Sequence, residues 1–557
     1  MRIQPVTRAQ ARLLLRHAVD PAHTARMTIA CGWEFRRTAF DVSVLAAALR
    51  QTVGRHDVLR ATFAVEPEPH AIVHDELDVT PEVRAFGTRD EASAWIADCA
   101  DQSFDIATAP LMRCHVAVAG DTVMLAVVTH HLLCDGRAFE ILIDELGTVD
   151  TDQDHPASQF YDIARAEASA LADPVAAAYV RRRQAELAGL EPLDLPIDFP
   201  RPMQPSGYGA VGRTRLPDVV GDRLGELART GLTPVVVGLA VFGVLLARYT
   251  GSTDIAVGVP VANRSWPGSW DAVGYLANTA VVRLHIDEAK SFETLVRRCR
   301  SQVLDTIDYS HVPLDEVVAA VRPDRSGGIN PLYQVTFAGN TLKPALIAGA
   351  LGTPLRLDRD IQVLDISVTL VRAESGYEVV WNYDTDLFEA GTADAMVRTY
   401  STLLEQLTAA PYAAVRSASG VHPHDAAMLA TWSGFDRLAA PTTTTVVQDF
   451  RRAASERPNA TAIVEGELRL TYAELDRWSD AVASTLAERG VGPGDIVGVG
   501  ESRSHRFPVA ALGVMKSGAA YLPLDPAYPA ALLHLMVRDA GARCGQHGDP
   551  QRRHDLA

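Results

Sequence analysis

Two adjacent histidines at the end of an apolar run constrain the fold of this chain more than any other feature of its sequence. Residues 123–128 read VMLAVV, which predicts a buried strand, and the loop that follows at residues 129–136 reads THHLLCDG. The next segment has apolar side chains at positions i, i+3, i+4 and i+7, the spacing of one helix face, and Gly147 is placed to end it. These apolar positions are Phe139, Leu142, Ile143 and Leu146. A strand, a loop and a helix in this order predict a mixed α/β or α+β region, with both histidines where a buried strand stops.

The spacing within this loop favours a chemical role for one histidine. Side chains alternate along a strand, so His130 and His131 should point to opposite sides and only one can face a given cavity. Asp135 is followed by a turn glycine, Gly136, and can fold back to fix the loop through a buried ion pair. The structural alternative is a pair of core histidines with satisfied hydrogen bonds. A metal site is disfavoured, because adjacent ligands that face opposite ways chelate poorly and no companion ligand cluster is visible.

The length of the 557-residue chain and the positions of its Pro-rich and polar segments predict several compact units. We expect one lobe over residues 1–175 and a second over 176–430, joined by the Pro-rich stretch LDLPIDFPRPMQPSGYG at 193–209. A linker over 431–445 ends in the run PTTTT, and helix and hairpin patterns restart over 446–542. The polar residues 543–557 carry no pattern, and we expect them to be disordered.

Charge and composition exclude several classes of partner. A formal charge of -17 argues against binding to nucleic acid or to an anionic membrane. The longest apolar run, residues 234–247, is shorter than the roughly 20 residues that cross a bilayer, and Thr233 and Pro234 are placed to begin a buried helix that ends near Gly251. The six cysteines form no CxxC pair, so neither a disulfide framework nor a zinc site is indicated. We expect a cytoplasmic protein without a bound metal.

Together, the HHxxxDG pattern and its surroundings resemble the condensation domains of nonribosomal peptide synthetases over about 430 residues. Further segments match the family's motifs in order. The first of these segments lacks the aromatic residue of the family's opening motif. In the HHxxxDG loop, Arg137 stands where the family usually has an aromatic residue after Asp-Gly. These segments are VTRAQARLLL (6–15), GRHDVLRATF (54–63), SFDIATAPLMR (103–113), FYDIA (160–164), LPIDFPRP (195–202), VGYLANTAVVR (273–283), SHVPLDEVV (310–318) and INPLYQVTF (329–337).

This resemblance implies a fold, a reaction and its partners. The fold is a V-shaped pseudo-dimer of two lobes similar to chloramphenicol acetyltransferase subunits, with a tunnel between them. The reaction is amide formation between an upstream acyl or peptidyl thioester and the amine of a downstream aminoacyl thioester. Each thioester is carried on the phosphopantetheine arm of a donor or acceptor carrier protein, so the chain itself needs no bound cofactor. We expect it to act as a monomer.

The resemblance also assigns roles to individual residues. His131 is expected to act as general base or as a hydrogen-bonding orienter of the amine, two roles that the sequence does not separate. Asp135 is expected to be structural and His130 to resemble it. Arg283 is the expected partner of Asp135, with Arg55 or Arg60 as alternatives, and Gly136 is expected to permit the tight turn. Asn330 and Ser367 are expected to line the substrate cavity.

A second resemblance begins where the linker ends. LTYAEL (470–475) and MKSGAAYLPLDPAYP (515–529) are similar to the first two motifs of adenylation domains, the adenylate-forming subdomains of the same synthetases. They cover only about 110 residues and include neither the phosphate loop nor the catalytic lysine subdomain of that family. We therefore expect a partial adenylation domain without ATP-dependent activation.

Other readings of the HHxxxDG pattern stay open. Epimerization domains share it, but the adenylation-like start that follows favours condensation, and heterocyclization domains replace the histidine pair with an aspartate-based pattern. A free-standing acyltransferase that uses a soluble amine or alcohol is an alternative from the same chemistry. An inactive docking module of a truncated synthetase is an alternative from a different class.

Overall fold

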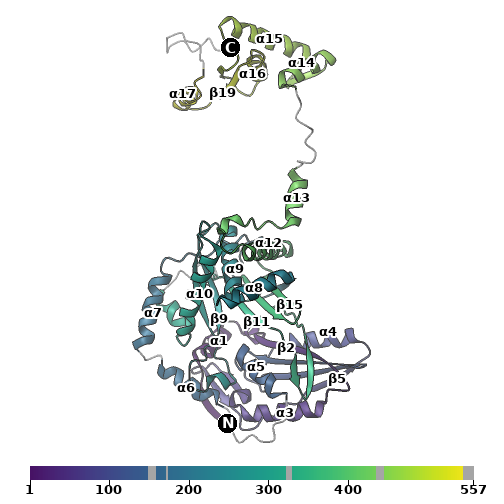
Figure 1. Cartoon of the computed structure of the whole chain (residues 1–557), viewed down its shortest axis with the longest axis vertical. Coiled ribbons are helices and arrows are strands. Elements are labelled where there is room, and N and C mark those ends of the chain that lie inside the picture. Colours follow the sequence, from purple (N-terminus) through teal and green to yellow (C-terminus); the bar gives the residue numbers. More distant parts are fainter. Residues whose placement is uncertain (148–157, 171–173, 322–328, 331, 434–443, 543–557) are drawn as a thin grey trace. The chain divides into compact units, whose positions relative to one another are not determined.

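The computed structural model describes residues 1–147, 158–170, 174–321, 329–330, 332–433 and 444–542 (Figure 1). It divides the chain into two compact units, Met1–Ala426 and Ala427–Ala557. The expected tail at 543–557 lies outside the described residues, as does most of the expected linker. Mixed helices and strands in both units confirm the predicted α/β class.

The first half of the larger unit contains the strand, loop and helix predicted around the two histidines. Its elements are β1 (Arg2–Pro5), α1 (Arg8–Val19), α2 (Pro21–Ala25), β2 (Thr28–Arg36), α3 (Val42–Arg55), η1 (Asp57–Arg60), β3 (Ala61–Ala64), β4 (His70–Val73), β5 (Glu82–Phe86), α4 (Arg89–Ala100), β6 (Met112–Ala119), β7 (Thr122–His130), α5 (Gly136–Glu145) and α6 (Phe160–Ala170).

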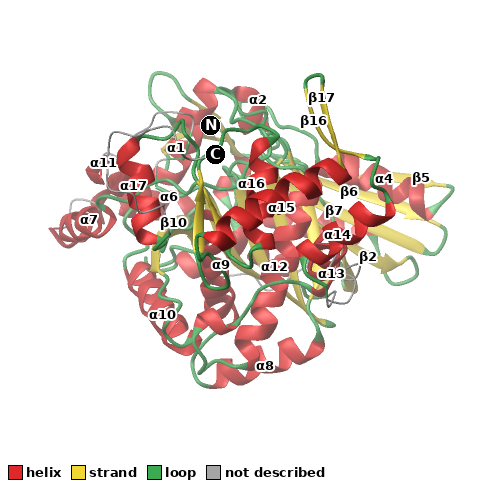
Figure 2. Cartoon of the chain, turned by 90° about the horizontal axis from the view of Figure 1, so that it is seen from above, coloured by secondary structure: helices red, strands yellow, loops and turns green. Residues whose placement is uncertain are grey.

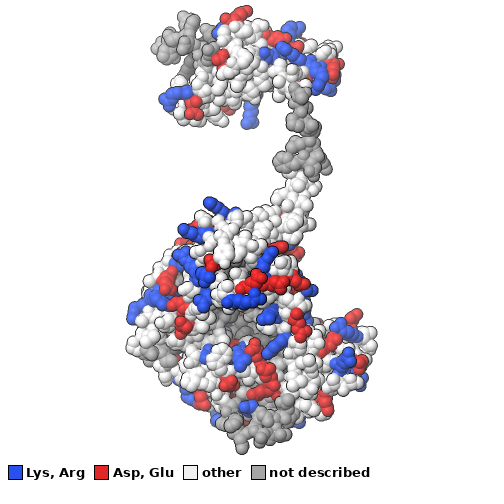
Figure 3. Space-filling model, viewed as in Figure 1, with Lys and Arg blue, Asp and Glu red and all other residues white. Residues whose placement is uncertain are grey.

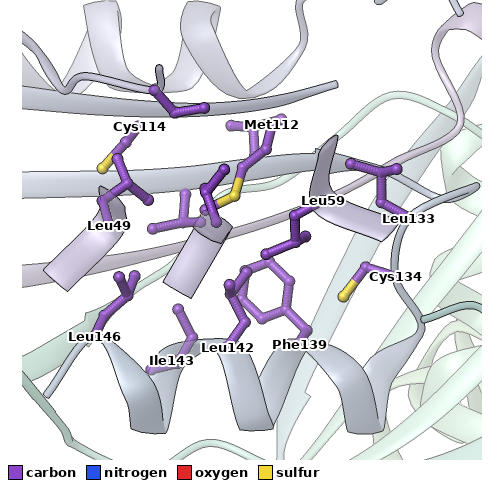
Figure 4. Close-up of a cluster of buried hydrophobic side chains, with 14 of the residues drawn as sticks. Leu49, Leu59, Met112, Cys114, Leu133, Cys134, Phe139, Leu142, Ile143 and Leu146 are labelled. Atoms are coloured by element: carbon purple, nitrogen blue, oxygen red, sulfur yellow. The ribbon is translucent and has the colours of Figure 1, made fainter. Parts of the chain in front are cut away.

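Strand β7 lies in the middle of a six-stranded sheet of order β12-β13-β2-β7-β6-β5. It pairs antiparallel with β2 on one side and β6 on the other, so a nearly continuous apolar sequence is buried along its length. The apolar face of α5 packs toward this sheet, and Figure 4 shows Phe139, Leu142 and Leu146 pointing toward Met112 and other core side chains. The strand therefore ends at a fixed place, and His130 is its last residue.

The second half of the unit is built in a similar way. Its elements are α7 (Pro174–Leu187), β8 (Gly209–Arg215), α8 (Asp218–Arg229), α9 (Pro234–Thr250), β9 (Asp254–Val261), η2 (Ser269–Asp271), β10 (Asn278–His285), α10 (Phe292–Asp308), α11 (Leu314–Val321), β11 (Val335–Thr341), β12 (Ala345–Ile347), β13 (Ala350–Leu355), β14 (Ile366–Ala373), β15 (Gly376–Asp384), α12 (Ala390–Ala409), η4 (Val415–Ser417) and α13 (Pro423–Ser433).

Helix α9 confirms the buried helix expected from the longest apolar run. Thr233 caps its first turn by accepting a hydrogen bond from the backbone N–H of Val236, and Pro234 is its first residue. Gly251 ends it with a left-handed φ of 71°. With α8, α10 and α12 (Figure 2), this helix packs on the sheet β10-β9-β11-β14-β15-β8. Phe242 meets Trp381 edge to face in their shared core.

The two halves interlock, and the expected boundary at residue 175 is not a clean division. Strand β13 belongs to the second half of the sequence but pairs antiparallel with β2 of the first, extending that sheet by two strands together with β12. Ala272, Val273 and Leu276 lie in the hydrophobic core of the first half. Backbone pairing and burial thus join segments far apart in the chain into one compact unit.

The second unit contains the helix, hairpin and helix predicted from residue 446 onward. Its elements are α14 (Val446–Glu456), β16 (Thr461–Glu465), β17 (Leu468–Thr471), α15 (Tyr472–Glu488), β18 (Ile496–Val499), α16 (Arg506–Lys516), β19 (Ala520–Pro523) and α17 (Ala530–Asp539). Strands β16 and β17 form an antiparallel pair, and β18 and β19 a parallel pair.

Positive and negative side chains are interspersed on the face of the larger unit that Figure 3 shows, without a continuous basic region on that face. Among the described residues, no single helix has the length and apolarity to cross a bilayer. Helices α8 and α9 reach that length and apolarity only when taken together, but the pair is bent by 113° and α9 is mostly buried in the core.

Candidate active site

His130 is held in a single, neutral protonation state by two opposite hydrogen bonds. Its Nε2 donates to the backbone carbonyl of Thr24 at 3.0 Å, while its Nδ1 accepts from the backbone N–H of Leu132 at 3.1 Å. The ring is fully buried and contacts Phe104 edge to face. Burial lowers the pKa of His130 to about 4, because a charged imidazole would lose its hydration there. The geometry gives this histidine a structural role.

His131 has different surroundings. Its backbone N–H donates to the carbonyl of Met27 at 2.9 Å, and its partly exposed ring lies 4.8 Å from the ring of Tyr275. Its Nδ1 is buried, and backbone groups of His131 itself and of Cys134 lie beside the ring. Burial lowers the pKa of His131, an effect that the carboxylate of Asp135 opposes. Adjacent in sequence, the two rings face different neighbours, although His131 lies in the turn after β7 and not in the strand itself.

Asp135 is the anchor of the loop. Its Oδ1 accepts from Arg264 at 2.6 Å and from the backbone N–H of Ala138 at 2.8 Å, which caps α5. Its Oδ2 accepts from the backbone N–H groups of Leu276 and Ala277, each at 2.9 Å. Both side chains of the ion pair are buried, at 2% exposure for Asp135 and 0% for Arg264. One carboxylate thus joins the histidine loop to the second half of the unit.

The prediction that Arg283 pairs with Asp135 is wrong, because Arg264 takes that place. Arg283 instead pairs with Asp254, at 2.5 Å, on the neighbouring strand. Arg55 lies 3.5 Å from Glu145, which also accepts a hydrogen bond from His56. Arg60 donates to backbone carbonyls at the end of α3 and near β4. All three predicted arginines are engaged elsewhere, and Arg264 was missed, although it lies only nine residues before the quoted segment 273–283.

Gly136 does not have the conformation expected of a turn glycine. It is the first residue of α5, it is not among the residues with positive φ, and a Cβ built on it would meet no atom within 4 Å. The tight turn therefore does not need its conformational freedom. The carboxylate of Asp135, as the helix cap, closes the loop instead.

The predicted cavity residues Asn330 and Ser367 lie in the second half of the unit. The backbone carbonyl of Asn330 accepts from Gln334 at 2.9 Å, and the hydroxyl of Ser367 accepts from Gln362 at 3.2 Å. Among the described residues, no hydrogen bond or ring contact joins either side chain to His131. Their place in a substrate cavity stays a prediction.

Helix α1 supports the same loop from the other side. Gln10 donates from Nε2 to the carbonyl of Leu132 at 2.7 Å, and its own helix begins at a capping box with Thr7. Arg12, one turn away, lines a cavity with Asn263, Leu276 and Asp315. Tyr275 and Arg12 were not predicted as site residues, although each stands inside a segment that matched a family motif.

This arrangement suits proton transfer more than metal chemistry. A neutral, partly exposed imidazole on a loop pinned between two halves can accept a proton from an amine brought beside it. No group of three or more His, Cys, Asp or Glu side chains in the described ranges is placed to hold a metal ion.

Comparison with known proteins gives two matches to family models. The model of the condensation domain matches residues 1–430. The model of the AMP-binding enzyme matches residues 450–549.

Curated relatives are large synthetases, of which this chain spans a small part. Chondramide synthase cmdD of Chondromyces crocatus is 30% identical over 97% of this chain and 14% of its own length. The dimodular nonribosomal peptide synthase of Bacillus subtilis (strain 168) is 30% identical over 96% of this chain and 24% of its own length.

Solved structures share the fold. The four-domain nonribosomal peptide synthetase AB3403, bound to AMP and glycine, matches 97% of this chain and 43% of that one, with a TM-score of 0.73 and 22% identity. The condensation domain of the Monacolin K polyketide synthase MokA matches 74% of this chain and 99% of that one, with a TM-score of 0.67 and 19% identity. The chain belongs to the condensation domain family of nonribosomal peptide synthetases, and part of an AMP-binding domain follows that domain.

Proposed function

We propose that the unit Met1–Ala426 forms an amide bond between a donor acyl or peptidyl thioester and the amine of an acceptor aminoacyl thioester. Both substrates arrive on phosphopantetheine arms of carrier proteins, which supply the activated thioester. The remaining tasks are to position the two arms and to take a proton from the attacking amine. Membership of the condensation domain family supports this assignment.

One observation carries the role of His131: its neutral, partly exposed imidazole lies on a loop that Asp135 and Arg264 pin in place. As the amine nitrogen attacks the thioester carbonyl, a C–N bond forms, the C–S bond breaks and the thiol of the donor arm leaves. His131 takes the proton that the amine loses, and that proton passes to the leaving thiolate. An imidazole whose pKa is lowered by burial is unprotonated at neutral pH, as this step requires.

The partners follow from the same chemistry. We propose a monomer that works in the cytoplasm with one donor and one acceptor carrier protein, and with neither nucleic acid nor a membrane. Its net charge of -17 supports the last two points.

Amide formation between two loaded carrier proteins, followed by mass spectrometry of the acceptor, tests the proposal. We expect product with the wild-type chain and a loss of about 10²–10⁴-fold in rate with His131→Ala, the usual range for removal of a general base. The thermal melt of that variant should match the wild type. Undiminished product from His131→Ala removes the imidazole from the chemistry. Product with a free amine or alcohol but none with a loaded acceptor carrier would favour a free-standing acyltransferase. Binding of carriers without any product would favour a docking module.

A further inference from the structure

The imidazole of His131 is supported by backbone groups and by one aromatic side chain. A catalytic histidine is normally held by a carbonyl or carboxylate on its second ring nitrogen, which fixes both its tautomer and its direction. Hydrogen bonds on both nitrogens fix His130, whereas backbone groups of His131 itself and of Cys134 lie beside the His131 ring. Ring packing is the side-chain contact that adds to this backbone support.

The side chain that provides this packing is Tyr275. Its ring centroid lies 4.8 Å from that of His131, with 57° between the ring planes. Aromatic pairs in this distance range attract one another in addition to burying apolar area. His131 belongs to the first half of the unit and Tyr275 to the second, so the contact crosses the interlocked halves.

Tyr275 is itself fixed at three points. Its carbonyl accepts a hydrogen bond from the hydroxyl of Thr7 at 3.3 Å, and its own hydroxyl is hydrogen-bonded to Arg12, so the N-terminal half of α1 contacts it twice. The backbone N–H groups of Leu276 and Ala277, the next two residues, donate to Asp135. The backbone beside Tyr275 is therefore held by the same carboxylate that holds the histidine loop.

We propose that Tyr275 is a positioning residue that orients the His131 imidazole toward the acceptor amine through ring packing. This inference rests on the proposed function of His131. A ring packed on one side of the imidazole limits its rotation while leaving the nitrogens free to exchange a proton. The hydroxyl of Tyr275 contributes indirectly, because its bond to Arg12 holds the ring and takes no part in the chemistry.

Two substitutions separate the ring from the hydroxyl. Tyr275→Phe keeps the packed ring and should retain kcat within about threefold, since it removes only a hydrogen bond remote from the reacting atoms. Tyr275→Leu removes the ring and should lower kcat about ten- to a hundredfold, the effect of misplacing a reacting group by a fraction of its contact distance. KM for the loaded acceptor carrier should change by less than about threefold, because the ring orients the base and does not bind the carrier.

Nuclear magnetic resonance of the full chain observes the imidazole of His131 directly. Histidine labelled with ¹³C and ¹⁵N gives a resonance for His131, identified by its loss in His131→Gln. We expect that resonance to shift or broaden in Tyr275→Leu and to stay in place in Tyr275→Phe. This readout does not need turnover, so it decides the orientation of the ring even if the wild type forms no amide and the proposed function fails.

Tyr309→Leu is the matched control. The Tyr309 ring is also half-buried and stacks on an aromatic partner, Tyr179, at 4.4 Å and 9°, with no contact to the histidine loop. It should lower stability without moving the His131 resonance or kcat. An unmoved resonance in Tyr275→Leu, or a kcat loss no larger than that of Tyr309→Leu, overturns the inference.

Discussion

Asp135 and Arg264 stand 129 residues apart in the sequence, and a 2.6 Å hydrogen bond joins their buried side chains. The same arginine donates to the backbone carbonyls of Ser269 and Ala272, at 2.7 and 2.6 Å. The pair therefore ties the loop of the two histidines to the segment that carries Tyr275. The position of the histidine loop depends on a connection between halves that no local sequence pattern contains.

Asp135→Ala should destabilise the larger unit by about 3–5 kcal/mol, because it leaves a buried guanidinium unpaired. It also removes the acceptor of the backbone N–H groups of Ala138, Leu276 and Ala277. Urea unfolding at neutral pH measures the loss. Asp254→Ala is the control, since it breaks the more exposed pair with Arg283 and should cost about 1 kcal/mol or less. Equal losses for the two variants would contradict the anchoring role of Asp135.

The stability of the unit should fall with pH below about 6.5 because of His130. The folded-state pKa of about 4 lies below the ordinary value of 6.5, so between these values the unfolded chain binds the proton and the folded chain does not. The contribution of neutral His130 to the free energy of unfolding is complete above pH 6.5 and is lost as the pH falls toward 4. A shift of this size corresponds to about 3 kcal/mol. His115 and His131, whose pKa values burial also lowers, act in the same direction.

Urea unfolding of the wild type and of His130→Gln at pH 7.5 and pH 5 measures this dependence. At pH 7.5 His130→Gln should be less stable than the wild type, since it loses the two hydrogen bonds that the His130 ring makes with the backbone of Thr24 and Leu132. Its stability should nevertheless change less between the two pH values than that of the wild type. A pH dependence as steep as the wild type's would mean that His130 is not the titrating group.

Local signals in the sequence predicted the elements that carry the site. The apolar run and its bounding Thr233, Pro234 and Gly251 defined α9, because capping and apolar periodicity act within a few residues. The same kind of signal placed both histidines at the end of β7 and predicted α5. The two rings have different surroundings, but strand alternation is not the reason, because β7 ends at His130 and His131 lies in the turn after it.

Local sequence signals did not predict the contacts between residues far apart in the chain. Many arginines stand at comparable distances in the sequence, and spacing alone cannot say which one reaches Asp135, so Arg264 was missed. Strands β12 and β13 are short and expose Leu346 and Leu351, so no apolar pattern revealed that they join β2. Their pairing depends on tertiary contacts and makes the sequential division into two lobes inexact.

ATP–pyrophosphate exchange dependent on an amino acid should be absent from this 557-residue chain. The AMP-binding match covers residues 450–549, which resemble the first two motifs of an adenylation domain but include neither its phosphate loop nor its catalytic lysine subdomain. Radiolabelled pyrophosphate incorporation with each proteinogenic amino acid measures the activity. Exchange above the rate of a heat-denatured sample would show that this unit contains a complete nucleotide site.

Deletion of residues 427–557 should leave the condensation unit folded and active. Its hydrophobic cores are formed within Met1–Ala426, and the contacts of the histidine loop with Arg264 and Tyr275 also lie within that unit. We expect the melting temperature of the fragment 1–426 to match the corresponding transition of the full chain within about 2 °C, a difference of about 2 kcal/mol or less for a unit of this size. Amide formation between loaded carriers should likewise stay within about twofold. A fragment that aggregates or melts much earlier would mean that residues 427–557 contribute to the stability of the first unit. A fragment that is stable but inactive would instead mean that they position a carrier protein.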